Sequence, residues 1–78
     1  MTATPRTLDQ LRPGETAVVR HVGGSGPLRR RLLDMGLVRG AAVTMIKTAP
    51  LGDPVQYRVR GYHLALRRAE AHTITLEA

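Results

Sequence analysis

The sequence contains no cysteine, phenylalanine or tryptophan, and two tyrosines are its only large aromatic side chains. Without cysteine, neither a disulfide framework nor a thiolate zinc site can stabilise so small a chain. No apolar run approaches the roughly 20 residues that a membrane-spanning helix needs, and the N-terminal residues lack the apolar segment of a signal peptide. We therefore expect a soluble, cytoplasmic protein that does not insert into a membrane.

Acidic residues are also scarce. Six Asp and Glu stand against twelve Lys and Arg, which gives a formal net charge of +6. Such an excess suits nucleic acid, an anionic membrane surface or an acidic protein partner. It equally fits a compositional preference for arginine without any function, because eleven of the twelve basic residues are Arg.

The sequence offers no combination of residues that is typical of catalysis or of metal binding. The six carboxylates are scattered singly, and no serine has a recognisable base. The histidines at positions 21, 63 and 72 do not share the spacing of metal ligands on one element. We predict no enzyme activity, no cofactor and no metal site.

What the sequence does contain is a series of short segments bounded by turn signals. The clearest is Val55–Arg60, where Val55, Tyr57 and Val59 alternate with polar residues. Five segments predict strands: Thr16–Val22, Ala41–Lys47, Val55–Arg60, Tyr62–Leu66 and Thr73–Leu76. We expect one domain, in which the five strands close into a small antiparallel barrel or sandwich, because closure removes exposed strand edges.

Finer expectations follow from the same patterns. In the fourth strand, Tyr62, Leu64 and Leu66 are predicted to face the core, and a slip in alternation at Arg20–Val22 indicates a bulge in the first. Pro13-Gly14 and Gly61 predict tight turns. Single helical turns are expected at Thr7–Leu11 and Arg68–Ala71, after a loose start at Met1–Arg6.

The longest helical pattern lies between the first and second strands. Leu28, Leu32 and Met35 fall on one face of a helix that we expect at about Pro27–Met35. The other face carries Arg29 and Arg30. Gly36 follows directly, where a left-handed residue commonly ends a helix.

Four stretches together resemble the FeoA family, the ferrous iron transport protein A of bacterial iron uptake: TLDQLRPGE, LRRRLLDMGLVRG, APLGDP and VRGYHLALRRAEAHTITL. The resemblance runs from about Thr7 to Leu76, so residues 1–78 are expected to be one FeoA-like domain with its core at about 7–77. One departure is Arg39, where the family usually has proline.

The resemblance implies a mainly β fold, a small SH3-like five-stranded antiparallel barrel with one inserted short α-helix. It also implies a small cytosolic accessory of a membrane ferrous iron transporter of the FeoB type, which carries a G-protein domain. Transition metal ion binding is implied only at the level of the family. The oligomeric state stays open.

Two alternatives remain for the function. A basic SH3-like barrel could bind nucleic acid, although such binding stacks bases on aromatic side chains and Tyr57 is predicted to face the core. The chain could also be a stand-alone relative of the SH3-like domain of metal-dependent transcriptional repressors. Such domains follow a DNA-binding helix-turn-helix, for which this chain has no room.

A partner-binding surface is the remaining interpretation. Its predicted residues are the exposed arginines of the helix and of the third strand, with two residues of the TAPLGDP loop: Arg29, Arg30, Arg58, Arg60, Leu51 and Asp53. Leu51 has no obvious core position, so it either presents an apolar contact or folds back over the open end of the barrel. Asp53 is expected to hold its own turn by hydrogen bonds to nearby backbone N–H groups.

Overall fold

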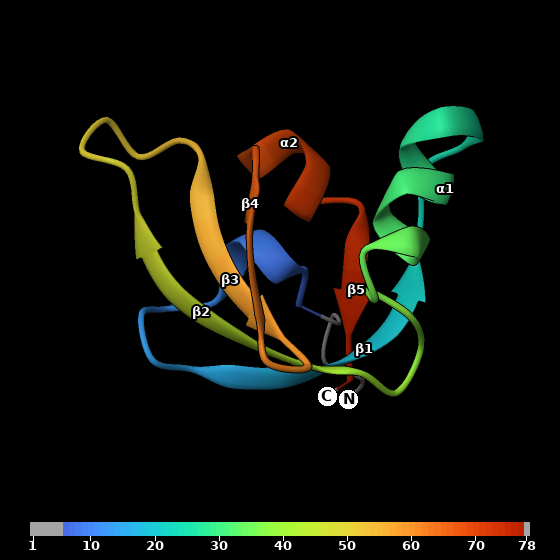
Figure 1. The fold of residues 1–78 in the computed structure, drawn as a ribbon, viewed down its shortest axis with the longest axis horizontal. Helices are drawn as coiled ribbons and strands as arrows, with labels where there is room; N and C mark the ends of the chain where they lie inside the picture. Colours follow the sequence, from blue (N-terminus) through green and yellow to red (C-terminus); the bar gives the residue numbers. More distant parts are fainter. Residues whose placement is uncertain (1–5, 78) are drawn as a thin grey trace, which may run out of the picture.

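The structure is a computed structural model that describes residues 6–77. The loose segment expected at Met1–Arg6 therefore lies outside the described residues except for Arg6. The elements follow one another as shown in Figure 1: η1 Leu8–Gln10, β1 Thr16–Val22, α1 Gly26–Asp34, β2 Ala42–Thr48, β3 Val55–Val59, β4 Tyr62–Leu66, α2 Arg68–Ala71 and β5 Ile74–Leu76. All five predicted strands are present, and both predicted helical turns form.

The five strands make one antiparallel sheet in the order β4-β3-β2-β1-β5. β1 pairs with two strands: Thr16–Val18 with β2, and the residues from Val19 onward with β5. The register shifts between Val19 and His21, which confirms the predicted bulge.

The sheet is open, so the predicted closure into a barrel is wrong. Within residues 6–77, β4 and β5 do not pair with each other. The chain passes from β4 to β5 through α2, and α2 contacts η1 (Figure 1). Leu8 of η1 and Ala71 of α2 are fully buried. These helical turns therefore cover the core where a closed barrel would have paired its last two strands.

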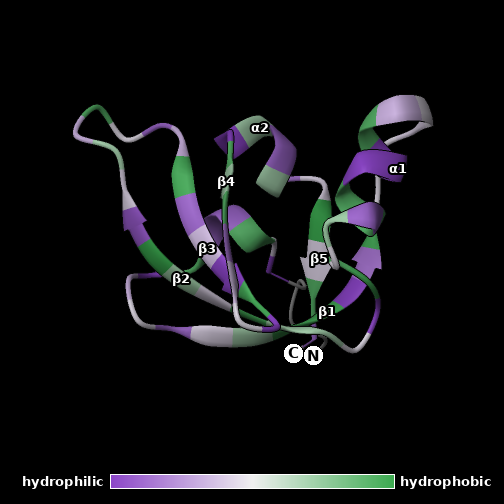
Figure 2. Cartoon of the chain, viewed as in Figure 1, coloured by the Kyte–Doolittle hydropathy of each residue, from purple (hydrophilic) through white to green (hydrophobic). Residues whose placement is uncertain are grey.

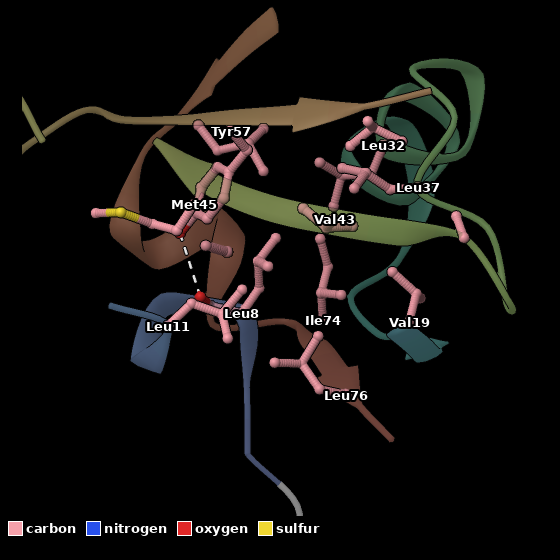
Figure 3. Close-up of a cluster of buried hydrophobic side chains, with 14 of the residues drawn as sticks. Leu8, Leu11, Val19, Leu32, Leu37, Val43, Met45, Tyr57, Ile74 and Leu76 are labelled. Carbon is pink, nitrogen blue, oxygen red and sulfur yellow. Dashed lines mark hydrogen bonds between the residues drawn. The ribbon is translucent and has the colours of Figure 1, made fainter. Parts of the chain in front are cut away.

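The core lies on the inner side of the bent sheet, under α1, η1 and α2. Figure 3 shows side chains from every layer meeting there: Leu8, Leu11, Val19, Leu32, Leu37, Val43, Met45, Tyr57, Ile74 and Leu76. The Tyr57 hydroxyl donates a hydrogen bond of 3.3 Å to the Leu8 carbonyl oxygen. Burial raises the pKa of Tyr57 to about 12, because the charged phenolate is disfavoured away from water.

The predicted face of α1 is confirmed. Leu32 is fully buried, and Leu28 and Met35 are half-buried against the core. Gly36 has φ +96° and ends the helix, while the Leu37 N–H donates 3.1 Å to the Leu32 carbonyl oxygen. The stop after Met35 thus turns the chain toward β2, as the glycine predicted.

The β3–β4 hairpin confirms the alternation of β3 and, at Leu64 and Leu66, that of β4. Val55, Tyr57 and Val59 are buried, and a tight turn at Arg60 and Gly61 joins the strands with φ values of +52° and +83°. Tyr62, predicted to face the core, is instead 70% exposed. Because the sheet is open and β4 is its edge, no strand among residues 6–77 lies beyond Tyr62 to cover it.

Candidate protein-binding site

The loop between β2 and β3 carries Leu51 at its end. The Gly52 N–H donates a hydrogen bond of 2.7 Å to the Ala49 carbonyl oxygen. The Ala49 N–H donates one of 2.9 Å to the Pro54 carbonyl oxygen. Gly52 has φ +89°, a backbone conformation that residues other than glycine rarely adopt. These bonds close the loop on itself and leave the Leu51 side chain 97% exposed. The alternative in which Leu51 folds back over the core is therefore wrong.

The same loop is tied to α2 by two hydrogen bonds. The Arg68 N–H donates 2.9 Å to Oδ1 of Asp53, and Nε of Arg68 donates 2.6 Å to the Gly52 carbonyl oxygen. Asp53 thus satisfies one of the first N–H groups of α2, which have no partner inside a helix. Asp53 was expected to hold its own turn, but the hydrogen bond that it accepts comes from Arg68 on another element. Sequence reasoning missed Arg68, which no local pattern marked as a partner of this loop.

A groove of about 410 Å³ lies beside the loop. Its walls are mainly apolar and come from the end of β2, the two prolines of the loop, and the outer face of β3 and β4: Lys47, Thr48, Ala49, Pro50, Pro54, Gln56 and Ala65. Figure 2 shows the hydrophobic end of the loop next to hydrophilic segments at its base. An exposed apolar side chain beside an apolar groove is suited to contact with another protein.

The two predicted helix arginines lie far from this loop. α1 and the β2–β3 loop lie at opposite ends of the longest axis of the molecule (Figure 1). Arg29 is also engaged within the fold, since its Nε donates 3.2 Å to the Val22 carbonyl oxygen. Arg30 is exposed on the same helix.

The remaining predicted residues occupy a third place. Arg58 lies opposite His63 in the β3–β4 pairing, and Arg60 is in the hairpin turn; all three are exposed. The structure therefore brings Leu51 and Asp53 together but does not gather the six predicted residues on one surface. The exposed Tyr62, adjacent to this turn, was missed because its alternation with Leu64 and Leu66 indicated a core position.

Within residues 6–77, the pKa values of Glu15 and Tyr57 are shifted. Glu15 accepts a 3.0 Å hydrogen bond from the Arg12 N–H and a 2.6 Å bond from Nη1 of Arg6. These bonds, the backbone one foremost, hold the pKa of Glu15 below its ordinary value. Both shifts have causes within the fold, namely hydrogen bonds at Glu15 and burial at Tyr57.

Residues 6–77 contain no group of three or more His, Cys, Asp or Glu side chains placed to hold a metal ion. The nearest approach is a pair, with Nδ1 of His72 3.2 Å from Oδ2 of Asp9. In the same part of the chain, no helix has the length and apolar composition that crossing a membrane requires.

Comparison with known proteins gives one consistent result. A family model described as the FeoA domain matches residues 6–78. A relative from Porphyromonas gingivalis, an Fe(2+) transport protein A/Fe(2+) transporter FeoB fusion protein, is 44% identical over 70 residues, which are 90% of this chain. This chain spans only 8% of that relative's length.

Solved structures agree with that match. The solution structure of the FeoA protein from Chlorobium tepidum has a TM-score of 0.85 and 44% identity, covering 91% of this chain and 68% of the other. A Stenotrophomonas maltophilia FeoA complexed with zinc, a prokaryotic SH3 domain protein, has a TM-score of 0.83 and 32% identity, covering 92% and 89%. A manganese-dependent transcriptional repressor at 18% identity and TM-score 0.83 shares the fold alone, and this chain covers 37% of it.

Proposed function

This chain belongs to the FeoA domain family, and on that premise we propose that it is a non-enzymatic accessory of ferrous iron uptake. In this proposal it acts in the cytoplasm and binds the cytosolic portion of a FeoB-type membrane transporter, whose activity it modulates. The SH3-like fold, with its sheet open and one helix inserted after β1, is a scaffold for that contact.

The observation that carries this proposal is the fusion protein. There, a region 44% identical to this chain is covalently joined to a FeoB transporter. Joining two modules keeps them at a high effective concentration, which is useful only if they act on each other. Where such a domain is not joined to the transporter, a binding surface of its own must supply that proximity.

The β2–β3 loop is the part of that surface that we assign to direct contact. Its hydrogen bonds to itself and to Arg68 fix its shape before binding, so little conformational entropy is lost when Leu51 meets a partner. In this proposal Leu51 makes the contact and Asp53 positions the loop. Arg29, Arg30, Arg58 and Arg60 lie on other faces, where their charge raises the rate of encounter with an acidic partner.

The test measures binding of the purified chain to the purified cytosolic portion of the FeoB-type transporter encoded in the same genome. We expect saturable binding with a Kd of about 1–100 μM, as is common for small regulatory contacts. In cells, deleting the chain should reduce ferrous iron uptake, and re-expression should restore it. Absence of binding at about 1 mM, with normal uptake in the deletion strain, would contradict the proposal.

Nucleic-acid binding is the second candidate, and the exposed Tyr62 next to Arg60 is the observation in its favour. One exposed tyrosine can stack on only one base, whereas single-strand binding proteins use several aromatic side chains. We therefore expect weak binding to oligonucleotides that falls steeply as salt rises. A tight, sequence-selective complex at physiological salt would favour this candidate over the transporter accessory.

A further inference from the structure

β4 forms an edge of the sheet whose outer side has no neighbouring strand within residues 6–77. In a hairpin with a two-residue turn, Val59 and Tyr62 exchange hydrogen bonds across the turn. The alternate residues of β4, His63 and Ala65, must then direct their N–H and C=O groups away from β3. These groups form a short template for one more strand.

A groove of about 350 Å³ runs beside this free edge, between β4 and the C-terminal end of α1. It is lined by Asp34, Met35, Tyr62, His63 and Leu64. Met35 and Leu64 are half-buried against the core and Tyr62 is 70% exposed, so the inner side of the groove is apolar. His63 lies on the other face of β4, opposite Arg58. A strand entering here would meet apolar side chains on one face and basic ones on the other.

The charges around β4 decide between possible occupants. Arg60 precedes the strand and Arg58 lies across from His63, whereas Asp34 is the one carboxylate among the groove residues. Arg67 and Arg68 follow the strand, and there the carboxylates of Glu70 and Asp53 accept hydrogen bonds from their N–H groups, so the excess of basic charge lies toward the hairpin turn. Antiparallel pairing of two copies about Leu64 would place the Arg60 end of one copy beside the Arg67 end of the other. Like charges at that distance destabilise a strand pair, so a second copy of this chain fits poorly. An acidic segment fits well.

We propose that the free edge of β4 binds an extended, acidic segment of a partner protein as a sixth strand. Backbone hydrogen bonds to His63 and Ala65 supply the strand pairing. Alternate apolar side chains of the segment cover Met35, Tyr62 and Leu64, and the intervening carboxylates face Arg58 and Arg60. The Leu51 loop itself is not part of this surface, although Ala65 also lines the groove beside that loop. The peptide titration monitors β4 and Leu51 separately, so the inference does not rest on the proposed function.

The test is an NMR titration of the full chain with a short, capped peptide of alternating glutamate and valine at an ionic strength of about 0.15 M. We expect shift changes confined to β4, the hairpin turn and Met35, together with slower hydrogen exchange at the His63 and Ala65 amides. A lysine–valine peptide of the same length should bind at least about tenfold more weakly. An oligothymidylate serves as the third probe.

The matched variants are Ala65→Pro and Ala65→Thr. Proline removes the outward N–H of an edge strand without breaking its pairing to β3, and threonine keeps that N–H. Unchanged amide shifts outside β4 confirm that both variants fold. We expect Ala65→Pro to bind the glutamate–valine peptide about tenfold more weakly than the original chain does. The affinity of Ala65→Thr for the same peptide should stay within about twofold of the original.

Several results would overturn the inference. The first is the absence of shift changes with the acidic peptide at about 1 mM, and the second is shift changes centred on Leu51 or on the outer face of α1. The third is equal affinity of the chain for the two peptides, or equal affinity of Ala65→Pro and the original chain for the acidic peptide. Stronger shifts at Tyr62 with oligothymidylate than with the peptide would assign the surface to nucleic acid instead. Concentration-dependent shifts of β4 without any peptide would assign it to self-association.

Discussion

Leucine is buried at one end of the molecule and exposed at the other. These ends are α1 and the β2–β3 loop, which lie far apart in Figure 1. At the α1 end, Leu32 is fully buried, Leu28 and Leu33 pack against the core, and the exposed long side chains are arginines. At the β2–β3 end, Leu51 is 97% exposed, and the polar Asp53 holds the loop in place. One end is stabilised by apolar packing and the other by hydrogen bonds.

This difference separates a structural leucine from one that is available for binding. A helix of two or three turns is unstable alone, so its apolar stripe must be buried. A loop fixed by its own hydrogen bonds needs no such burial, and the apolar side chain at its end contributes nothing visible to folding. The comparison predicts that substitutions at the α1 end change stability, whereas those at the loop end change binding.

The largest effect is expected at the α1 end. Leu32→Ala removes a fully buried side chain and should lower the free energy of unfolding by roughly 2–5 kcal/mol, measured by urea denaturation. Leu28→Ala is the matched control and should cost less, because Leu28 is only half-buried. Equal stability of Leu32→Ala and the original chain would contradict the claim that the α1 end is stabilised by apolar packing.

The free energy of unfolding is expected to depend on pH through Tyr57, which is buried in β3. Its pKa rises from 10.0 to about 12 in the folded state, so between these values the unfolded chain loses a proton that the folded chain keeps. Stability is therefore intact below about pH 10 and falls by roughly 2–3 kcal/mol as the pH rises to about 12. Tyr57→Phe should remove this difference, measured by urea denaturation at each pH.

Tyr62→Phe is the control for that experiment, since it removes an exposed phenol and should leave the alkaline loss in place. Tyr57→Phe also removes one of the two hydrogen bonds to the Leu8 carbonyl oxygen, which still accepts one from the Leu11 N–H, and should cost about 1 kcal/mol at neutral pH. If the alkaline loss persisted in Tyr57→Phe, another group would be responsible for it.

A smaller effect is expected where the loop is tied to α2. Asp53→Ala removes the acceptor of the Arg68 N–H and should lower the free energy of unfolding by about 1 kcal/mol. Hydrogen exchange of the Arg68 amide should speed up, because its partner is gone. Asp34→Ala removes an exposed carboxylate from α1 and is the control that should leave this amide unchanged. A loop that keeps its protection without Asp53 would show that the Gly52–Arg68 bond suffices.

Much of the fold followed from the sequence because alternation and helical spacing report which side chains face inward. Val55, Tyr57 and Val59 were assigned to the core on that basis, as were Leu32 and the stop at Gly36. The four family motifs also indicated the FeoA family, which the comparisons confirm.

The missed features all depend on contacts between distant segments. Whether β4 meets β5 is decided by how η1 and α2 fill the space between them, and no local pattern reports that. Tyr62 was misplaced for the same reason, since its alternation is regular but its strand lies at an open edge. Asp53 bonds to Arg68, fifteen residues away, so the turn sequence alone could not identify its partner. The six predicted site residues were scattered because their common exposure says nothing about a common surface.

The central claim is that Leu51 acts outside the folded core, and the most direct test measures stability and binding on the same Leu51→Ala sample. We predict a change in the free energy of unfolding within about 0.5 kcal/mol and binding to the FeoB-type cytosolic portion weakened by about tenfold or more. Leu51→Met keeps an apolar side chain of similar size and should bind nearly as well as the original chain. Unchanged binding by Leu51→Ala, or a loss of stability as large as that of Leu32→Ala, would contradict the account.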